Sequence, residues 1–507
     1  MWSLVLRAAS DRTDEVLLAD DHGRTLTASD LHDEAERVAA GLAAQGVGAG
    51  DVVSWQLPSV LELPVLMAAL SRLGAIQNPI IPLLREREVS VIAEQVSPRL
   101  FICPTEWRAF SHAGMARSFG LDVLALDLEA PPGPSDPLRL PTGDPAQLPP
   151  HHDDPDECRW IFYSSGTTSI PKGVRHSDAS IAAGSNGVVH QLGLGSGDIY
   201  PIAWPLSHIG GSAMFGAVLR NGGTICTVDT FDPATTPQRM AELGATMLGS
   251  ATPFFLAYTA AQRAKGADPL FPRLRTVVSG GAPTPSEVNR EVVEVLGVAG
   301  VAGAWGLTEF PVATSETPDD PWVGTTAGRP VTDVEVRVVD GELRLRGPQC
   351  FLGYVDSSLD ADAFDADGWF RTGDLGHLDQ DGCIHVDGRI KDVIIRNAEN
   401  ISAQEVEEVL LRHPGVADVA VVGIPDPRTG ERVAAVVVPA ADQPADSTAD
   451  PTADPTVDLA TLVAHCAESG LSRYKHPEHL QLVDVLPRNS MGKVLKADLR
   501  KQLAAEV

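Results

Sequence analysis

The sequence predicts an α/β protein: a large N-terminal domain of α/β sheets with a β-rich subdomain, then a small, mobile C-terminal α+β domain. Three observations support this. Short apolar runs alternate with helical patterns, the texture changes over residues 330–386 to short alternating strands, and a smaller α/β piece begins after Gly388. Because 507 residues are too many for one ordinary domain, we expect domains at residues 1–387 and 388–507.

The N-terminal elements follow from periodicity. Apolar positions at helical spacing predict a helix over residues 29–47, with Ser29 as its N-cap and Gly46 near its end. Residues 52–57 then read as a strand and residues 61–73 as a buried helix. Further short apolar runs predict strands at Leu100–Cys103, Val123–Leu126, Thr224–Val228 and Leu274–Val278. Because helical patterns separate most of these strands, we expect mainly parallel sheets.

The C-terminal third has shorter elements. Alternating residues predict strands at Val334–Val339 and Glu342–Arg346 in the β-rich subdomain. Beyond Gly388 we expect a helix near Gln404–His413 and strands at Val419–Val422 and Ala434–Val438. Residues 442–458 repeat Asp, Pro, Thr and Ala, a low-complexity acidic composition typical of a mobile surface loop.

Composition excludes several classes of function. Hydrophobic residues make up 43% and charged residues 21%, which is typical of a soluble globular enzyme. The net charge of −29 argues against nucleic acid and anionic membranes as partners, because both need a basic surface. No segment approaches the roughly 20 apolar residues of a membrane span. Six widely spaced cysteines without a C-x-x-C pair fit neither a zinc site nor a disulfide framework, so a cytoplasmic location is expected.

The most informative segment is Tyr163–Gly173, a run of glycines and hydroxyls that ends in Pro-Lys-Gly. It follows the apolar run Trp160–Tyr163, so backbone N–H and hydroxyl donors come directly after a buried strand. Such a loop can surround phosphate oxygens. It is not a Walker A loop, because Pro171 replaces the second glycine and Gly173 follows the lysine. An ordinary polar turn is the alternative. The candidate phosphate ligands are Ser164, Ser165, Gly166, Thr167, Thr168 and Lys172.

Five further segments follow in order along the chain: Ser279–Pro283, Ala304–Glu309, Arg371–Asp374, Gly388–Asp392 and Pro487–Lys493. Each has an ordinary explanation when it is considered alone, such as a core aromatic residue, a charged turn or a solvated lysine. All of them together, in this order, resemble the adenylate-forming superfamily, and within it the acyl-CoA synthetase branch. The resemblance covers nearly the whole chain.

The resemblance implies a site for ATP and Mg²⁺. It assigns Trp305 to adenine, Gly306 to the nucleotide site, Thr308 to the α-phosphate, and Glu309 with Thr167 to Mg²⁺. An aromatic face, a hydroxyl donor and a hard oxygen ligand suit these roles. Residues bordering adenine and the acyl pocket would be Gly280, Gly281 and Ala282; those at the ribose and its phosphate would be Asp374 and Arg389.

The resemblance also implies the reaction. A carboxylate attacks the α-phosphorus of ATP, giving an acyl-adenylate and pyrophosphate, and a thiolate then displaces AMP. Thr167, Thr168 and Lys172 would hold the β- and γ-phosphates. Lys493 would bridge the carboxylate and the α-phosphate. The small domain would then rotate about the hinge residue Lys391, so that Lys493 leaves and CoA enters.

The acid is less well defined. Pro205–Gly211 matches the helix start beside the acyl pocket, with His208 at the position that gates between the ATP and thiol sites. A packed histidine is the alternative. No acidic residue stands nearby to bind an ammonium group, so an uncharged acid is favoured. Apolar lining could come from Met214, Phe254, Phe255 and Phe310, although each could equally belong to the core.

The sequence departs from the superfamily pattern at two positions, the first in the phosphate loop and the second at a position that concerns the acceptor. Ser169 replaces a glycine of the phosphate loop, and Ala398 replaces a glycine that lines the pantetheine tunnel in CoA-using relatives. CoA is the first choice, and a carrier protein or a nitrogen nucleophile is the alternative. A silent nucleotide-binding relative and an unrelated ATPase are disfavoured. A homodimer is compatible with the sequence.

Overall fold

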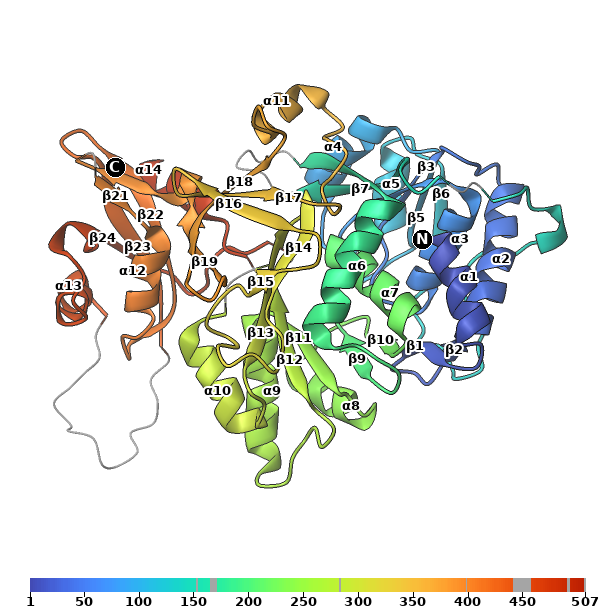
Figure 1. The fold of residues 1–507 in the computed structure, drawn as a ribbon, viewed down its shortest axis with the longest axis horizontal. Helices are drawn as coiled ribbons and strands as arrows, with labels where there is room; N and C mark the ends of the chain where they lie inside the picture. The colour runs from blue at the N-terminus through green and yellow to red at the C-terminus, as the bar shows by residue number, and fades with distance from the viewer. Residues whose placement is uncertain are drawn as a thin grey trace. The chain divides into compact units, whose positions relative to one another are not determined.

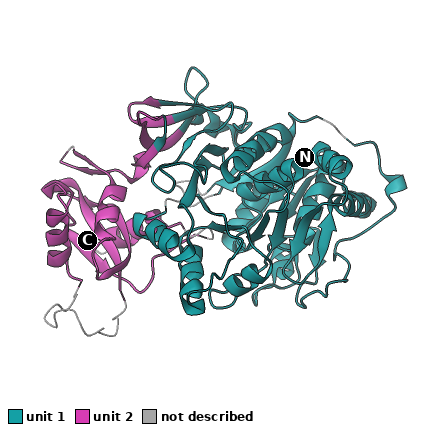
Figure 2. Ribbon diagram, turned by 60° about the horizontal axis from the view of Figure 1, so that its bottom comes forward, with its two compact units in different colours: residues 1–337, 344–371, 382–384 teal, residues 338–343, 372–381, 385–507 magenta. Residues whose placement is uncertain are grey.

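The computed structural model describes residues 1–151, 154–164, 171–281, 284–397, 399–440, 457–489 and 493–505 (Figure 1). The chain divides into two compact units (Figure 2). The first comprises residues 1–337, 344–371 and 382–384, and the second comprises residues 338–343, 372–381 and 385–507. The domain boundary after residue 387 stays a prediction. No described helix is long and apolar enough to cross a membrane.

The first unit contains three sheets. The largest has the order β6-β5-β3-β4-β7-β8, and all its pairs are parallel except β7 with β8. Its strands are β3 (Val52–Trp55), β4 (Ile76–Pro79), β5 (Leu100–Pro104), β6 (Val123–Leu126), β7 (Cys158–Ser164) and β8 (Lys172–Ser177). The apolar run before the predicted phosphate loop is therefore a strand, as expected.

The other two sheets of this unit are mixed: one has two parallel pairs and the antiparallel pair β1–β2, and the other has two parallel pairs and the antiparallel pairs β13–β14 and β14–β15. Parallel pairs are the majority in the described part of this unit as a whole, as predicted. One has the order β2-β1-β10-β9 and the other β11-β12-β13-β14-β15. Their strands are β1 (Val16–Asp20), β2 (Thr25–Thr27), β9 (Ile199–Ile202), β10 (Thr224–Thr227), β11 (Met247–Ser250), β12 (Thr276–Gly280), β13 (Val301–Leu307), β14 (Phe310–Ser315) and β15 (Arg329–Pro330).

Eleven helices accompany these sheets among the described residues: α1 (Trp2–Asp11), α2 (Ala28–Ala44), α3 (Glu62–Leu73), α4 (Glu86–Val96), α5 (His112–Ser118), α6 (Asp178–Leu192), α7 (Ile209–Asn221), α8 (Thr236–Glu242), α9 (Thr252–Lys265), α10 (Ser286–Leu296) and α11 (Asp360–Ala363). The predicted N-cap Ser29 of α2 is wrong. Thr27 caps the helix, because its hydroxyl accepts from the Asp30 N–H while the Asp30 carboxylate accepts from the Thr27 N–H.

The predicted β-rich segment forms a four-stranded sheet with the order β16-β17-β18-β19. Its strands are β16 (Glu335–Val339), β17 (Glu342–Arg346), β18 (Phe370–Leu378) and β19 (Ile384–Arg389). The division between the two compact units passes through these strands.

The last sheet has the order β21-β20-β23-β22, with β24 also paired to β23. It comprises β20 (Ile394–Arg396), β21 (Glu399–Ile401), β22 (Val416–Asp426), β23 (Gly430–Pro439) and β24 (His479–Leu482), with helices α12 (Ala403–Leu410), α13 (Leu459–Glu468) and α14 (Lys496–Ala505). Alternate residues of β22 enter two apolar clusters: Val419 and Val421 pack with α12 and α13, whereas Ala420 and Val422 pack with α14. The sheet is therefore covered on both faces. Residues 441–456, most of the predicted acidic loop, lie outside the described residues.

Candidate active site

The β7–β8 hairpin carries the predicted phosphate loop. Ser164 and Lys172 are opposite each other in its antiparallel register, so these two candidate ligands lie at the mouth of the loop. The Gln95 amide fixes the second strand, since it donates to the Pro171 carbonyl at 2.8 Å and accepts from the Gly173 N–H at 3.2 Å. Other predicted residues lie outside the described part of the chain: Ser165, Gly166, Thr167, Thr168, Ser169, Ala282 and Ala398.

Glu309 is connected to this hairpin through Tyr354. The segment containing Tyr354 pairs with β8, since the Val355 N–H donates to the Gly173 carbonyl at 2.8 Å. The Tyr354 hydroxyl donates to Glu309 Oε1 at 2.9 Å, and the Lys172 ammonium lies 5.7 Å from the centre of the Tyr354 ring. Glu309 is only 7% exposed. Burial and the adjacent carboxylate raise the pKa of Tyr354, so its hydroxyl keeps the proton that it donates.

This arrangement fits Mg²⁺ in the company of a phosphorylated ligand. Among the described residues, no cluster of three or more His, Cys, Asp or Glu side chains could hold a metal alone. Mg²⁺ is commonly bound by one or two carboxylates together with substrate phosphates, and Glu309 offers a buried carboxylate whose orientation Tyr354 fixes.

We expect Glu309→Gln to raise the Mg²⁺ concentration needed for adenylate formation, because a neutral amide is a poorer ligand for a hard cation. The amide oxygen can still accept from Tyr354, so the fold should remain. Tyr354→Phe removes only the orienting hydrogen bond and should cost about 10- to 100-fold in metal affinity or activity. The measurement is a Mg²⁺ titration of pyrophosphate release. Normal turnover of Glu309→Gln at limiting Mg²⁺ would exclude Glu309 as the ligand.

A second hydrogen bond joins the hairpin to the Thr308–Glu309 segment, and sequence analysis did not predict it. His176 of β8 is fully buried, and its Nε2 lies 2.8 Å from the Thr308 carbonyl oxygen. Since a carbonyl can only accept, Nε2 carries the proton. Burial lowers the pKa of His176 to about 4, so the ring is neutral near pH 7. The hairpin thus fixes both the side chain of Glu309 and the backbone before it.

The glycines and the aromatic residue assigned to adenine lie at the ends of two neighbouring parallel strands. Gly280 ends β12 and Gly281 follows it with φ +82°, and a Cβ on either residue would meet no atom of the described residues within 4 Å. Backbone without side chains permits the close approach of a planar ligand. Trp305 lies on β13. Gly306 has a packing reason to be glycine, since a Cβ there would lie 2.6 Å from the Val312 nitrogen.

His208 caps helix α7. Its Nδ1 accepts from the Gly210 N–H at 3.2 Å, so the neutral ring carries its proton on Nε2. Burial lowers the pKa of His208 to about 4. The cap accounts for the histidine by itself, and the gating role stays a prediction. Two of the aromatic residues named as pocket lining, Phe255 and Phe310, are fully buried in separate apolar clusters and therefore belong to the core.

The second unit gathers the remaining predicted residues. Arg389 at the end of β19 pairs with Asp374 of β18, with 2.8 Å between Nε and Oδ1. Asp374 is only 2% exposed. Lys391 follows within a short 3-10 turn, Ile390–Asp392. The ion pair connects the two residues assigned to the ribose and its phosphate, while their contacts with a nucleotide stay a prediction.

Lys493 lies in the same charged cluster. A hairpin presents it: the Leu495 N–H donates to the Pro487 carbonyl at 2.8 Å, and the Lys493 N–H donates to Asn489 Oδ1 at 2.9 Å. Burial and the positive charge of Arg389 lower the pKa of Lys493 to about 8, although Asp374 opposes the shift. Three cations and two carboxylates thus form a cluster suited to phosphate: Arg389, Lys391, Lys493, Asp374 and Asp392.

We expect adenylate formation to fall as the pH rises through about 8. A lysine is charged below its pKa, so raising the pH removes the cation that we expect to stabilise negative oxygens. His176 and His208 have pKa values near 4, so their titration should not change the rate near pH 7. The measurement is kcat/KM for ATP against pH, which reports the free enzyme. A profile flat through pH 8 would contradict this assignment.

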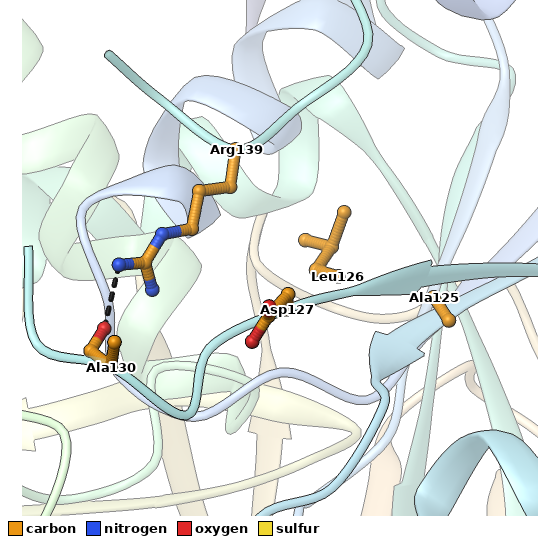
Figure 3. A pocket seen from close by; sticks show the side chains of 5 residues that line it. All are labelled: Ala125, Leu126, Asp127, Ala130 and Arg139. Carbon is orange, nitrogen blue, oxygen red and sulfur yellow. Dashed lines mark hydrogen bonds between the residues drawn. The ribbon is translucent and has the colours of Figure 1, made fainter. Parts of the chain in front are cut away.

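A separate hollow of about 320 Å³ lies at the carboxyl end of β6, at the opposite edge of the largest sheet from β8. Figure 3 shows its lining, in which Arg139 donates to the Ala130 carbonyl at 2.6 Å. It contains none of the predicted site residues.

Comparison with known proteins identifies the family. Residues 5–355 match the AMP-binding enzyme family, and residues 405–493 match the AMP-binding enzyme C-terminal domain. The chain belongs to this family. The expectation of an adenylate-forming enzyme of the acyl-CoA synthetase branch is therefore confirmed.

Three relatives of this AMP-binding enzyme bear on its chemistry. It is 30% identical to the medium-chain fatty-acid–CoA ligase of Escherichia coli (strain K12), over 99% of this chain and 89% of that one. Its structure resembles ATP-bound MatB from Rhodopseudomonas palustris, with TM-score 0.84, 28% identity and 99% of both chains covered. It also resembles the amide bond synthetase McbA from Marinactinospora thermotolerans, with TM-score 0.82, 27% identity and 99% of both chains covered.

Proposed function

We propose that this AMP-binding enzyme activates an uncharged, hydrophobic carboxylic acid with ATP and transfers the acyl group to CoA. The observation that supports this best is the β7–β8 hairpin, which presents Ser164 and Lys172 at the mouth of a glycine- and hydroxyl-rich loop and holds Glu309 beside it through Tyr354. The combination provides donors for phosphate oxygens and a carboxylate for Mg²⁺.

In the first half-reaction the acid's carboxylate attacks the α-phosphorus and pyrophosphate leaves. Lys172 and the hydroxyls Thr167 and Thr168 hold the departing phosphates. Mg²⁺, when bound, neutralises charge on the phosphate oxygens. Lys493 donates to oxygens of the α-phosphate as negative charge builds there, and this is why its ammonium must stay protonated.

In the second half-reaction a thiolate attacks the activated acyl carbon and AMP leaves. The groups that stabilise the first transition state have no part in this step. The small domain therefore rotates about Lys391 and removes Lys493 from the reacting centre. Such a motion suits a lysine on a hairpin beyond the hinge turn Ile390–Asp392.

The preference for an uncharged acid rests on the start of helix α7. No acidic residue stands in its first turn, and His208 is neutral near pH 7. An ammonium group on the substrate would therefore lack a partner there, at a desolvation cost of several kcal/mol for a buried ion.

The acceptor has one specific alternative. McbA is an amide bond synthetase of the same fold, and Ala398 stands where the resemblance to the superfamily implies a glycine in CoA-using enzymes. A nitrogen nucleophile, or the thiol of a carrier protein, would then take the place of CoA.

A panel of carboxylic acids tests the proposal. Pyrophosphate release should require ATP, Mg²⁺ and one class of uncharged acid, and CoA should convert the adenylate to a thioester identified by mass. Parallel reactions with amines and with a pantetheinylated carrier protein decide the acceptor. Pyrophosphate release that is independent of any acid would exclude the adenylation reaction. Consumption of an amine without thioester formation would establish the alternative.

A further inference from the structure

Two ion pairs tie the lysine-bearing end of the chain to the rest of the second unit. Arg500 of helix α14 pairs with Asp392 Oδ1 at 2.5 Å, and Lys496 at the start of the same helix pairs with Glu407 Oε1 at 2.7 Å. Glu407 also accepts from the Val421 N–H at 2.6 Å. All four charged side chains are between 16% and 28% exposed, so solvent screens these pairs less than fully exposed ones.

The ion pair between Asp392 and Arg500 lies next to the proposed hinge residue Lys391. Asp392 is the first residue after Lys391 and ends the hinge turn. Arg500 lies on the helix that begins three residues after Lys493, and that helix packs through Leu499 and Leu503 against the sheet. The pair therefore joins the residue immediately beyond the hinge to the body that carries Lys493.

We propose that Asp392 and Arg500 are positioning residues that confine the hinge rotation to Lys391 and the residues before it. This rests on the proposed function. A hinge works when a few residues absorb the change in backbone angles. With Asp392 held to α14, residues beyond Lys391 move with Lys493 as one body. Without the pair, several residues would share the rotation and Lys493 would reach a wider range of positions.

Without the ion pair, even a small displacement of Lys493 should have a large effect on the rate of adenylate formation. A misplacement of about 1 Å can cost about 100-fold in rate, because the reacting groups leave the productive geometry. The expected defect is therefore in kcat for adenylate formation, with little change in the KM for ATP.

The charged groups around Lys493 and Asp392 provide a second measurement, the pH dependence of adenylate formation. Lys493 faces Arg389, Lys391, Asp374 and Asp392, and Asp392 faces Arg500, Lys496 and Lys391. The negative charge of Asp392 raises the pKa of Lys493. In Asp392→Asn the loss of adenylation activity at alkaline pH should therefore begin at lower pH. Arg500→Gln breaks the same pair and leaves Asp392 charged. In this variant the loss of activity at alkaline pH should not shift to lower pH.

The test uses Asp392→Asn, Arg500→Gln and the double variant of the full-length enzyme. Hydrogen–deuterium exchange of residues 388–397, measured without substrates, should speed up in each single variant and no further in the double variant. Adenylation kcat, measured by ATP–pyrophosphate exchange, should fall about tenfold in each, with no additional loss on combination. Glu405→Gln is the control, because it breaks a comparable pair with Lys475 in the same unit.

The outcomes separate this inference from the proposed function. Unchanged exchange in the hinge segment, independent multiplicative losses, or an equal defect in Glu405→Gln would overturn the positioning role. If the native enzyme released no pyrophosphate with any acid, the proposed function would fall, and hinge exchange would still decide whether the pair restrains the hinge. Thermal unfolding of each variant identifies any that fails to fold, in which case the other single variant decides.

Discussion

Replacing Lys493 with alanine should slow acyl-adenylate formation by about 10²- to 10³-fold, the usual cost of removing one donor that stabilises charge in the transition state. The second half-reaction, started from a supplied acyl-adenylate and CoA, should proceed at close to the native rate. The reason is that the Lys493 ammonium acts on negative charge that develops only while the α-phosphate is attacked. The measurement is the rate of each half-reaction separately.

Lys501→Ala is the matched control, since Lys501 is an exposed lysine of α14 on the same unit. It should leave both half-reactions unchanged. An equal loss in both half-reactions of Lys493→Ala would show that the lysine has another role. An effect of Lys501→Ala as large as that of Lys493→Ala would point instead to the overall charge of the unit.

Much of the fold could be predicted because local patterns and burial agree. Alternation of apolar residues located β16 and β17, and the apolar run before the phosphate loop is β7. Element ends were less predictable. Thr27 and Ser29 are both good N-caps, and only the reciprocal bonds with Asp30 select Thr27. Strand β22 extends beyond the expected Val419–Val422 because its flanking residues also pair with β23.

The contacts that organise the candidate site could not be predicted in the same way. Tyr354 lies 45 residues from Glu309, and His176 lies 132 residues from Thr308, so no local spacing links them. They meet because β8 pairs with the segment before α11 and lies beside the β13–β14 hairpin. The motifs supplied residue types, whereas the orientation of Glu309 and the neutral state of His176 depend on tertiary burial.

The sequence predicts Lys391 at the hinge, but it does not predict the contacts of the turn that contains it. The motif contains Asp392, but its partner Arg500 lies 108 residues later. The sequence therefore predicts the residue about which the small domain turns, and the structure adds the ion pair that holds the residue after it.

Lys391→Pro should separate the two half-reactions in the opposite sense from Lys493→Ala. Proline fixes φ and removes a backbone donor, so a hinge that must change its backbone angles at this residue should be held in one state. We expect acyl-adenylate to form at near the native rate, while thioester formation falls by at least about tenfold. Lys391→Ala is the control, because it removes the same charge and leaves φ free, so thioester formation should fall less in this variant than in Lys391→Pro. The measurement is single-turnover formation of acyl-adenylate and of thioester in each variant. Unchanged overall turnover of Lys391→Pro would exclude Lys391 as the hinge, and an equal loss in Lys391→Ala would assign the effect to its charge.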